Sequence, residues 1–430
     1  MSEYTAVLEQ YRLNVDRNYR RNAIAIMIDN SMFYLISLGL SQYTILPLYL
    51  SKLTDSNLLI GLIPTVFVIG FALPQLWIAR FLRGKRRSKK YIITVAVVQR
   101  LSILAFLLLT LFQHHLSNNL VIALFFINYA IQNLTTGAWF PMWVDFVGRA
   151  IPHKRGMVFG LSYLIGGVLS LLGGVLITYL LTSLPYPNAI SASAAIAFFA
   201  SLVSLAAILC WKEVEVPEKP EQAIAREAHG DLFLKVRKDR NFHRFLIWRG
   251  VIVALEMALP FLTINALLRM NLEDAQVGIF AVILSVSQTA LNVFWGWIGD
   301  RIGYLKIILV SAFLGAVGAI LAASASTVAM FYVIFFLMGA MLAGMQLAGI
   351  NIIFEFAYDD VPTYTAINQL VLSPLSGAAP LLGGVLAGGL GYASLFWISG
   401  LVALVGFVGM ALKVKSPFQT PLVLRDSKEA

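Results

Sequence analysis

The sequence predicts an all-α integral membrane protein in which twelve transmembrane helices form two six-helix bundles related by pseudo-symmetry. Of its 430 residues, 59% are hydrophobic and 13% are charged, whereas ordinary soluble domains carry about a quarter charged residues. Long apolar runs recur along the whole chain, and part of the first half is repeated in the second. Composition, apolar runs and repeat together predict the fold class before any single motif is considered.

Twelve apolar stretches are each long enough to cross about 30 Å of hydrocarbon, which takes roughly 20 helical residues. They are predicted at residues 24–50, 57–80, 91–113, 119–143, 156–183, 188–211, 245–268, 275–297, 305–325, 328–354, 365–389 and 391–413. A charged segment with two prolines separates the sixth stretch from the seventh. We therefore expect an N-terminal segment 1–22, a bundle 23–211, a linker 212–243, a bundle 244–414 and a tail 415–430.

The repeat relates the two bundles directly. The hexapeptide Leu-Leu-Gly-Gly-Val-Leu occurs at residues 171–176 and again at 381–386, 210 residues later. The flanks agree at the same offset, since Asp145 corresponds to Glu355. Such fixed-spacing similarity indicates an internal duplication. An even number of spans separates the copies, so both halves enter the membrane from the same side, an arrangement found in secondary transporters.

Basic residues alternate with the spans and predict the orientation. Clusters of Lys and Arg follow the second and fourth spans, whereas the opposite connections are almost uncharged. The positive-inside rule then places both termini and the linker in the cytoplasm, for a protein of the plasma (inner) membrane. Because these charges lie in short clusters between spans, the net charge of +10 indicates a lipid bilayer as the partner and no nucleic acid. A monomer is expected.

Several classes of chemistry find no support in the sequence. The single Cys210 and five scattered His residues show no spacing typical of a metal site, so neither a metal nor another cofactor is expected. The chain contains no P-loop for ATP and no nucleophile motif of the hydrolases. We expect a protein that is not an enzyme and that is driven by a gradient. The polar segment 1–22 does not resemble a cleavable signal peptide.

The segment after the eighth span carries a recognisable signature. Residues 296–306 read Gly-Trp-Ile-Gly-Asp-Arg-Ile-Gly-Tyr-Leu-Lys and resemble the G-x-x-x-D-R-x-G signature of the major facilitator superfamily. With twelve spans and a charged midpoint linker, the resemblance covers essentially the whole chain. It implies bundles that rock about a central cavity lined by the first, fourth, seventh and tenth spans. The hexapeptides, in spans five and eleven, are then expected at the interface between the halves.

The resemblance also implies a gate at the cytoplasmic end. Asp300 is expected to face a helix N-terminus, where unpaired N–H groups favour an anion, and Arg301 is expected to pair with Glu355. Either Arg80 or Arg83 is the corresponding partner of Asp145. The predicted gating residues are Gly296, Asp300, Arg301, Gly303, Arg80, Arg83, Asp145 and Glu355. The alternative is that these are ordinary charges of solvated loops. The first-half loop lacks the Asp, so the latch is predicted to be one-sided.

Glu256 is the first candidate for transport chemistry, because charges in the bilayer interior are costly and rare. It lies twelve residues after Arg244 along the seventh span, about 18 Å at 1.5 Å per residue, and hence near mid-membrane. Arg249, Pro260 and Thr263 share its predicted helix face. Such a Glu is suited to bind a proton in one cavity state and release it in another. The alternative is a structural Glu paired across helices.

Asp29 and Arg100 form a second candidate pair in the first half. Here the structural interpretation is favoured, because a buried Arg needs a carboxylate nearby and the third span is peripheral in the family. Asp29 at the membrane interface is the other alternative. The remaining predicted substrate residues of the cavity spans are aromatic or amide side chains, namely Tyr34, Gln42, Trp139, Asn265, Gln346 and Asn351. Amide and aromatic groups suit an amphipathic solute.

The sequence therefore predicts a secondary active transporter that works by alternating access. It is expected to move a small amphipathic or weakly polar solute, with efflux coupled to protons as an antiporter. A sugar or metabolite symporter or uniporter of the same fold is the alternative. A transport-inactive membrane sensor or a channel is the alternative from another class. Fold alone does not fix the substrate.

Overall fold

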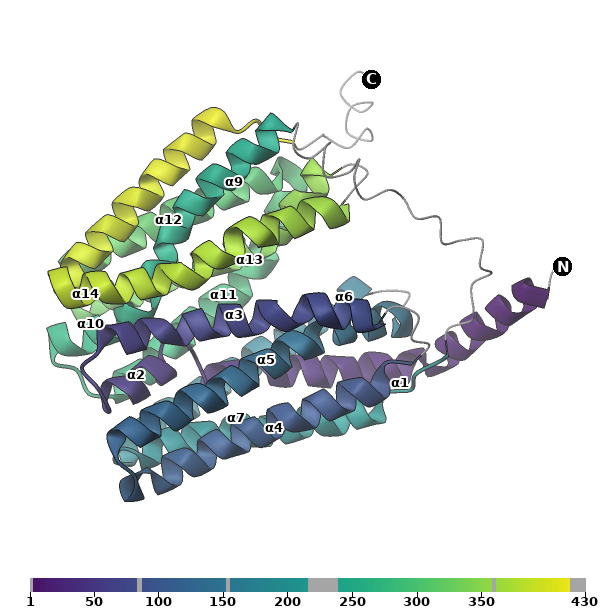
Figure 1. The fold of residues 1–430 in the computed structure, drawn as a ribbon, viewed down its shortest axis with the longest axis horizontal. Helices are drawn as coiled ribbons and strands as arrows, with labels where there is room; N and C mark the ends of the chain where they lie inside the picture. Colours follow the sequence, from purple (N-terminus) through teal and green to yellow (C-terminus); the bar gives the residue numbers. More distant parts are fainter. Residues whose placement is uncertain (1–2, 83–86, 152–154, 216–238, 358–360, 418–430) are drawn as a thin grey trace. The chain divides into compact units, whose positions relative to one another are not determined.

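A computed structural model describes residues 3–82, 87–151, 155–215, 239–357 and 361–417 (Figure 1). Every regular element in these ranges is a helix. Contacts within the chain define two units. Unit 1 comprises Met1–Asp55, Val66–Ala225 and Glu273–Val282, and unit 2 comprises Ser56–Thr65, Arg226–Leu272 and Ile283–Ala430. Each unit thus includes one short segment from the opposite half of the sequence.

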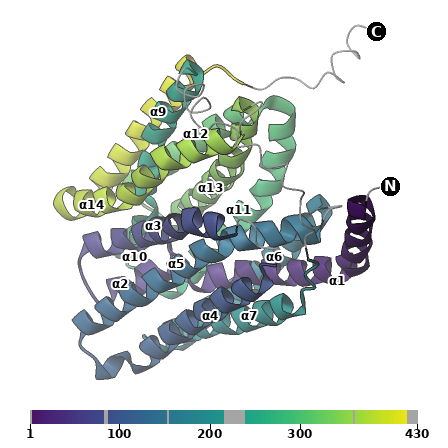
Figure 2. The same ribbon diagram turned by 45° about the vertical axis from the view of Figure 1, so that its right-hand side comes forward.

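Unit 1 is built mainly from the first half of the chain. Its elements are α1 (Glu3–Gly39), α2 (Ile45–Ser51), most of α3 (Asn57–Leu82), α4 (Lys89–Phe112), the 3₁₀ turn η1 (Gln113–His115), α5 (Asn118–Ala150), α6 (Arg155–Ser183) and α7 (Asn188–Cys210). Helix α1 packs against α6 and α7, and α4 packs against α5 and α7. Figures 1 and 2 both show α4 and α7 side by side. The start of α11 (Ala275–Ile302) also belongs to this unit.

Unit 2 is built mainly from the second half. Its elements are α9 (Arg240–Ile252), the 3₁₀ segment η3 (Val253–Met257), α10 (Leu259–Met270), the rest of α11, α12 (Tyr304–Ser324), α13 (Val328–Phe356) and α14 (Val361–Lys413). Helix α12 packs against α13 and α14, and α14 also packs against α9 and η3. The first nine residues of α3, before Val66, belong to this unit as well.

Eleven helices of the described chain are long and apolar enough to cross a membrane. The last of them, α14, contains Gly391 with φ 79° and ψ 165°, so its two arms change direction at this residue. Only glycine adopts such a conformation without strain. The predicted spans 365–389 and 391–413 are these two arms. Counted in this way, the described chain contains the twelve predicted apolar segments.

Two predicted spans are interrupted helices, and proline explains both interruptions. The first span breaks between α1 and α2, and Pro47 lies in the first turn of α2. The seventh breaks at η3, and Pro260 lies in the first turn of α10. A proline has no N–H to continue the α-helical ladder and its ring disfavours an unbroken helix. The predicted continuous helices over 24–50 and 245–268 are therefore wrong at these two points.

Helix α1 also begins earlier than predicted. The first span was placed at 24–50, but α1 is helical from Glu3 and has 37 residues. At 1.5 Å per residue it is about 55 Å long, well beyond the roughly 30 Å of hydrocarbon. The polar segment 1–22 is therefore largely a continuation of the first membrane helix, because charged residues such as Arg, Lys and Glu have good helix propensity outside the bilayer.

The first hexapeptide lies in α6, within unit 1. A Cβ on Gly173 would meet the side chain of Leu35 in α1, and a Cβ on Gly174 would meet the side chain of Val282 in α11. Both glycines therefore permit close helix packing, as small residues do in membrane bundles.

The second hexapeptide lies in α14, within unit 2, and repeats this pattern. A Cβ on Gly383 would meet the backbone of Met257 in η3, and a Cβ on Gly384 would meet the backbone of Asn57 and Leu58 in α3. In each copy the first glycine contacts the first span of its own half. The second glycine contacts a helix from the opposite half of the sequence. The duplication has preserved the contacts of the two glycines as well as the sequence of the hexapeptide.

Candidate transport site

The break in the seventh span places Glu256 at an irregular turn. In an α-helix the N–H of residue 260 would bond the carbonyl of residue 256, but Pro260 has no N–H. The chain instead forms i to i+3 bonds here, such as Ala258 N–H to the Leu255 carbonyl (3.2 Å). Residues Val253–Met257 are consequently a 3₁₀ segment. A 3₁₀ stretch inside a long helix often marks a functional position.

One hydrogen bond positions the Glu256 carboxylate. Ser376 Oγ of α14 donates to Glu256 Oε1 at 3.1 Å. The next residue of α14, Gly377, accepts from Thr65 Oγ1 at 2.7 Å, so this turn of α14 is bonded on two sides within unit 2. Glu256 is only partly buried as a residue, and the Ser376 hydroxyl holds its carboxylate in place.

Arg249 is the charge nearest to Glu256 along the same span. The two side chains attract each other electrostatically, but the ion pairs of the described residues do not include them. Both are partly exposed, whereas Pro260 and Thr263 are buried. The predicted polar face therefore stops at the break. Each 3₁₀ residue turns about 120° instead of 100°, so five residues rotate the following helix by about 100°.

The first span shows a parallel feature in unit 1. Gln42 lies in the break between α1 and α2, and its Oε1 is buried without a hydrogen-bond partner. Tyr34, eight residues earlier, makes an edge contact with Tyr163 of α6 at 6.1 Å between ring centroids. Trp139 of α5 packs on Trp143 at 5.6 Å, and its buried indole N–H has no partner. Aromatic rings and buried polar atoms without partners thus lie on α1, on α5 and in the break after α1, and the cavity that these helices are expected to line stays a prediction.

The remaining predicted substrate residues lie apart from Glu256 along unit 2. Asn265 is buried in α10, and its Nδ2 has no partner. Gln346 of α13 is exposed and accepts from Gln288 of α11 at 3.2 Å. Asn351 donates to the Leu347 carbonyl of its own helix at 2.8 Å. None of the hydrogen bonds among the described residues joins these three amides to the Glu256 carboxylate.

Asp29 and Arg100 are brought together, as the sequence suggested. Asp29 is 4% exposed and Arg100 is 6% exposed. Asp29 is therefore inside unit 1, and its depth relative to the membrane interface stays a prediction. The two charges are linked through Ser204 of α7, since Arg100 donates to its Oγ and its Oγ donates to Asp29.

The signature loop adopts a different set of contacts from the one predicted. Tyr304 donates its hydroxyl to Asp300 Oδ1 at 2.5 Å, and the Arg301 guanidinium lies 3.9 Å from the ring centroid of Trp297. Glu355 Oε1 accepts from the Tyr304 backbone N–H, the first residue of α12, at 2.8 Å. The anion at the helix N-terminus is thus Glu355. The expected Arg301–Glu355 ion pair is not formed between these described residues.

The signature glycines lie within this turn and at its start. Gly303 has φ 88° and immediately precedes α12, so only a glycine fits the connection without strain. Gly296 lies on α11, where a Cβ would be 3.6 Å from the Leu347 side chain. Position 303 therefore has a strict backbone requirement, whereas position 296 tolerates a methyl group.

The corresponding first-half partners are only partly described. Asp145 forms an ion pair with Arg149, four residues later in α5. Arg83 and the side chain of Arg80 lie outside the described residues. The predicted pairing of Asp145 with one of them therefore stays a prediction.

The N-terminus of α4 is capped by a carboxylate that the sequence analysis did not select. Glu213 accepts from the backbone N–H groups of Ser88 (2.5 Å) and Lys89 (3.1 Å). Lys89 Nζ in turn donates to the carbonyls of Leu209 and Trp211 at the end of α7. The start of α4 and the end of α7 thus cap each other.

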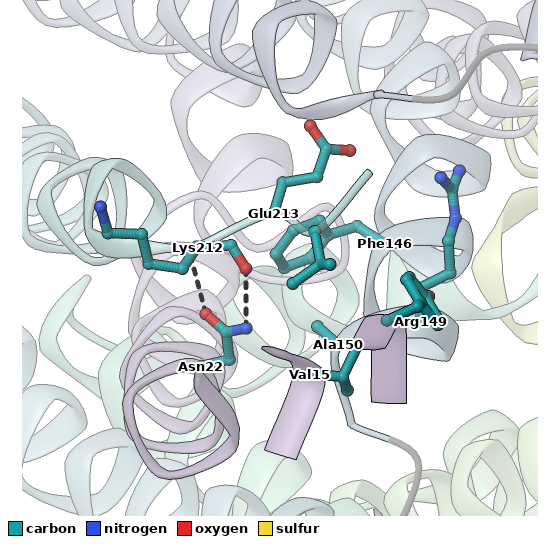
Figure 3. Close-up of a pocket in the computed structure, with 9 residues that line it drawn as sticks. Val15, Asn22, Phe146, Arg149, Ala150, Lys212 and Glu213 are labelled. Carbon is teal, nitrogen blue, oxygen red and sulfur yellow. Dashed lines mark hydrogen bonds between the residues drawn. The ribbon is translucent and has the colours of Figure 1, made fainter. Parts of the chain in front are cut away.

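A shallow pocket lies beside this junction in unit 1, and Figure 3 shows its lining. Asn22 makes two hydrogen bonds to the backbone of Lys212, at 2.8 and 2.9 Å, and Phe146 and Arg149 complete the wall. None of the predicted substrate residues lines this pocket. We refer to the Asn22–Lys212 contact as the first clasp.

Sequence reasoning missed the residues that connect the predicted charges. Ser376 bonds Glu256 and Ser204 bonds Asp29, and Glu213 and Asn22 hold the end of α7. Serine and asparagine are common in membrane helices, so their identity alone carries little signal. One feature of the sequence could have indicated the first clasp. Asn241 shortly precedes the seventh span, as Asn22 shortly precedes the first.

The architecture and this site define a polytopic helical membrane protein built by duplication, with a broken helix that exposes an acid inside the apolar region. A family model for the Major Facilitator Superfamily matches residues 27–271 and again residues 258–428. The chain belongs to the major facilitator superfamily and is a membrane transporter of that superfamily. The two matches follow the two repeats. No curated protein matches the chain.

Solved structures of low identity share the fold. A nucleoside transporter, NupG in a D323A mutant, has a TM-score of 0.68 at 12% identity and covers 92% of this chain and 100% of its own. A D-xylose–proton symporter has a TM-score of 0.68 at 14% identity, with coverage of 93% and 99%. A bacterial homologue of the human lysosomal transporter Spinster has a TM-score of 0.59 at 13% identity, with coverage of 94% and 95%. At these identities the likeness concerns the fold alone.

Proposed function

We propose that the protein is a secondary active transporter that exports a small amphipathic or weakly polar solute in exchange for protons bound by Glu256. The observation that carries this proposal is the break of the seventh span at Glu256 itself. Interrupted helices near mid-membrane are typical of substrate and ion sites in secondary transporters. The proline that causes the break lies four residues after the acid, so the helix interruption and the candidate proton site occur at the same turn.

The surroundings of Glu256 support proton exchange. Ser376 gives the carboxylate a hydrogen-bond donor that can also accept when the acid is protonated. Arg249 supplies a positive charge without forming a direct ion pair. A carboxylate held by a tight bidentate ion pair would resist protonation, whereas this looser attraction leaves both protonation states accessible. Binding of a proton neutralises the Glu256 carboxylate and thereby removes its attraction to Arg249.

The character of the solute follows from the other side chains on the predicted cavity helices. Tyr34 and Trp139 present aromatic faces, and Asn265 and Gln42 carry buried amide atoms with no hydrogen-bond partner. Such groups bind a solute that is partly apolar and has a few hydrogen-bonding atoms. We further propose a monomer in the plasma membrane with both termini in the cytoplasm, as the positive-inside rule requires.

The test is transport in proteoliposomes against a panel of amphipathic solutes, with and without an imposed pH gradient. We expect Glu256→Gln to abolish gradient-driven accumulation and to retain solute exchange in the absence of a gradient, because the amide keeps shape and hydrogen bonding but binds no proton. Glu273→Gln is the matched control, since Glu273 lies in the connection before α11. Full gradient-driven transport by the Glu256→Gln variant would refute the proton role.

The same assay separates export by exchange from symport. A pH-sensitive dye inside the vesicles reports the direction of proton movement relative to the solute. Protons that move opposite to the solute support an antiporter. Protons that move with the solute support the symporter of sugars or metabolites, and solute flux without proton movement supports a uniporter.

A further inference from the structure

A continuous hydrogen-bonded chain of side chains crosses unit 1. Ser204 Oγ of α7 donates to Asp29 Oδ1 of α1 at 2.6 Å, and Arg100 Nη2 of α4 donates to Ser204 Oγ at 2.5 Å. Ser204 is 2% exposed and both charged residues are almost completely buried. One hydroxyl therefore joins an anion on α1 to a cation on α4.

The chain continues to a fourth helix. Arg100 Nη1 donates to Gln99 Oε1 at 2.7 Å, and Gln99 Nε2 donates to Thr136 Oγ1 of α5 at 2.7 Å. Helices α1, α7, α4 and α5 are thus linked by side chains alone. By the predicted order of spans, the two ends of the chain lie on spans one and four, and the middle lies on the peripheral spans six and three.

The guanidinium is satisfied mainly by neutral acceptors. Besides Ser204 and Gln99, it donates to the Ser201 and Ala96 carbonyls, each at 3.2 Å. These bonds satisfy the hydrogen-bond donors of the guanidinium but do not neutralise its charge. A buried guanidinium stays protonated and needs a counter-ion. Asp29 is the acid that interacts electrostatically with it. Protonation of Asp29 would therefore leave a buried cation uncompensated.

The second half of the chain gives an independent comparison. Asp29 lies seven residues after Asn22, and Trp248 lies seven residues after Asn241. Arg100 is the twelfth residue of α4, and Gly315 is the twelfth residue of α12. At these two positions, counted from Asn241 and from the start of α12, unit 2 carries neither charge, and the Trp248 ring lies against Gly409 of α14.

We infer that Asp29 is the permanent counter-ion of Arg100, positioned by Ser204, and that this pair holds the first bundle together instead of carrying protons. Asp29, Arg100 and Ser204 are positioning residues in this assignment. The pair then fixes spans one and three relative to each other, and the bonds through Gln99 and Thr136 extend this link to span four while the transporter changes state. The inference does not depend on the proton role of Glu256, because it concerns a different unit.

Neutralisation of one charge or both tests the inference. We expect Asp29→Asn and Arg100→Gln each to lower the transport rate about ten-fold or more, because either change leaves one buried charge alone. The double variant should recover to within about three-fold of the wild type and keep the wild-type pH profile of transport. Single variants with wild-type rates, or a double variant that transports but has lost the response to pH, would overturn the inference.

Ser204 supplies a second test that does not remove a charge. Ser204→Ala should raise KM or lower the rate measurably and leave the pH profile unchanged, and Ser204→Thr should restore the hydroxyl and the activity. Ser201→Ala is the matched control, because the Ser201 hydroxyl bonds only the Phe198 carbonyl of its own helix. Equal effects of the Ser204→Ala and Ser201→Ala changes would show that the bridge has no positioning role. Failure of the double charge variant to transport, with an intact fold by thermal melting, would also overturn the inference.

Discussion

Both units hold the ends of their helices with the same contact, in which an asparagine side chain bonds the backbone of a lysine. The charged residues around this contact differ between the units. In unit 1, Asn22 bonds the backbone of Lys212 through both atoms of its side-chain amide. In unit 2, Asn241 bonds the backbone of Lys415 in the same way, at 2.8 and 2.9 Å. We call the latter the second clasp. Each clasp ties the start of a half to the end of that half.

The charges around the clasps have diverged. In unit 1 the N-terminus of α4 is capped by Glu213, which follows the last helix of its half. In unit 2 the N-terminus of α12 is capped by Glu355, at the end of α13. The repeat partner of Glu355 is Asp145, which is bound by Arg149 instead. A helix N-terminus needs an anion or another acceptor, but the physics does not specify which loop supplies it.

The two acids of the membrane spans show the same divergence. Asp29 in unit 1 is buried in a closed network, whereas Glu256 in unit 2 is partly buried at a broken helix. Duplication has therefore preserved the scaffold, and the two proposals above assign each half a different task. The comparison predicts that equivalent substitutions in the two units have unequal effects.

The largest difference is expected at the hexapeptide glycines. In Gly384→Ala the new methyl group would lie 2.6 Å from the Asn57 carbonyl oxygen and 3.0 Å from Leu58 Cα. Backbone atoms move only if the helix moves, so we expect a loss of about 2 to 3 kcal/mol. In Gly174→Ala the methyl group overlaps Val282 Cγ2, which a change of the valine rotamer can relieve without a shift of the backbone, so the expected loss is smaller, about 1 to 2 kcal/mol.

Thermal melting of the purified variants in detergent tests this difference, with transport rates as the functional readout. Gly388→Ala is a control on α14, because a Cβ there meets nothing within 4 Å. If Gly174→Ala destabilises as much as Gly384→Ala, the two copies of the hexapeptide are equally constrained and the asymmetry is wrong.

The glycines also show what the sequence could predict. The repeat placed both copies in equivalent helices, and the close contacts at Gly174 and Gly384 follow from that placement. Whether the contact is a side chain or backbone depends on helix separation, which no local pattern encodes. Similarly, Glu256 stood out as a lone charge in an apolar run. Its partner Ser376 lies 120 residues away, in a helix with several other small polar residues.

The next effect is expected at the clasps. Asn22 is 1% exposed, and Asn22→Leu would remove both hydrogen-bond partners of the Lys212 backbone in a part-buried contact. We expect a loss of about 1 to 3 kcal/mol. Asn241 is less buried, so water can replace its amide and Asn241→Leu should cost about 1 kcal/mol.

Melting temperatures again provide the measurement, and Asn→Asp at each position is the informative control. The carboxylate retains the acceptor for the backbone N–H but loses the donor for the carbonyl, so its effect should be intermediate. A larger loss for Asn241→Leu than for Asn22→Leu would contradict the role assigned to burial.

A smaller effect is expected at the helix caps. Glu213 accepts three hydrogen bonds, one of them from Ser88 Oγ at 3.2 Å, whereas Glu355 accepts one. We expect Glu213→Gln to cost about 1 kcal/mol and Glu355→Gln about 0.5 kcal/mol, because the amide keeps one acceptor but loses the charge at the helix N-terminus. Hydrogen exchange of the first turn of α4 and of α12 reports each cap locally. Equal protection in both variants would contradict the difference.

The smallest effect is expected where each unit holds its segment from the opposite half of the sequence. Unit 1 does so with an ion pair, Lys52 Nζ to Asp274 Oδ1 at 2.8 Å, and unit 2 with a neutral hydrogen bond, Tyr392 hydroxyl to Asn57 Oδ1 at 2.7 Å. Tyr186 lies close enough to this ion pair to sense the Asp274 charge. Burial raises the pKa of Tyr186, and the negative charge of the Asp274 carboxylate raises that pKa further. The ion pair is nevertheless about one-third exposed, so Lys52→Gln should cost only about 0.2 to 1 kcal/mol.

Salt distinguishes the two contacts. Because the Debye length falls from about 10 Å at 0.1 M to about 3 Å at 1 M ionic strength, the destabilisation by Lys52→Gln should largely disappear at high salt. Tyr392→Phe removes a neutral bond, and its effect should be the same at both salt concentrations. The measurement is the melting temperature of each variant minus that of the wild type at the two ionic strengths. A salt-independent effect of Lys52→Gln would mean that packing of the lysine stem, and not its charge, holds the segment in unit 1.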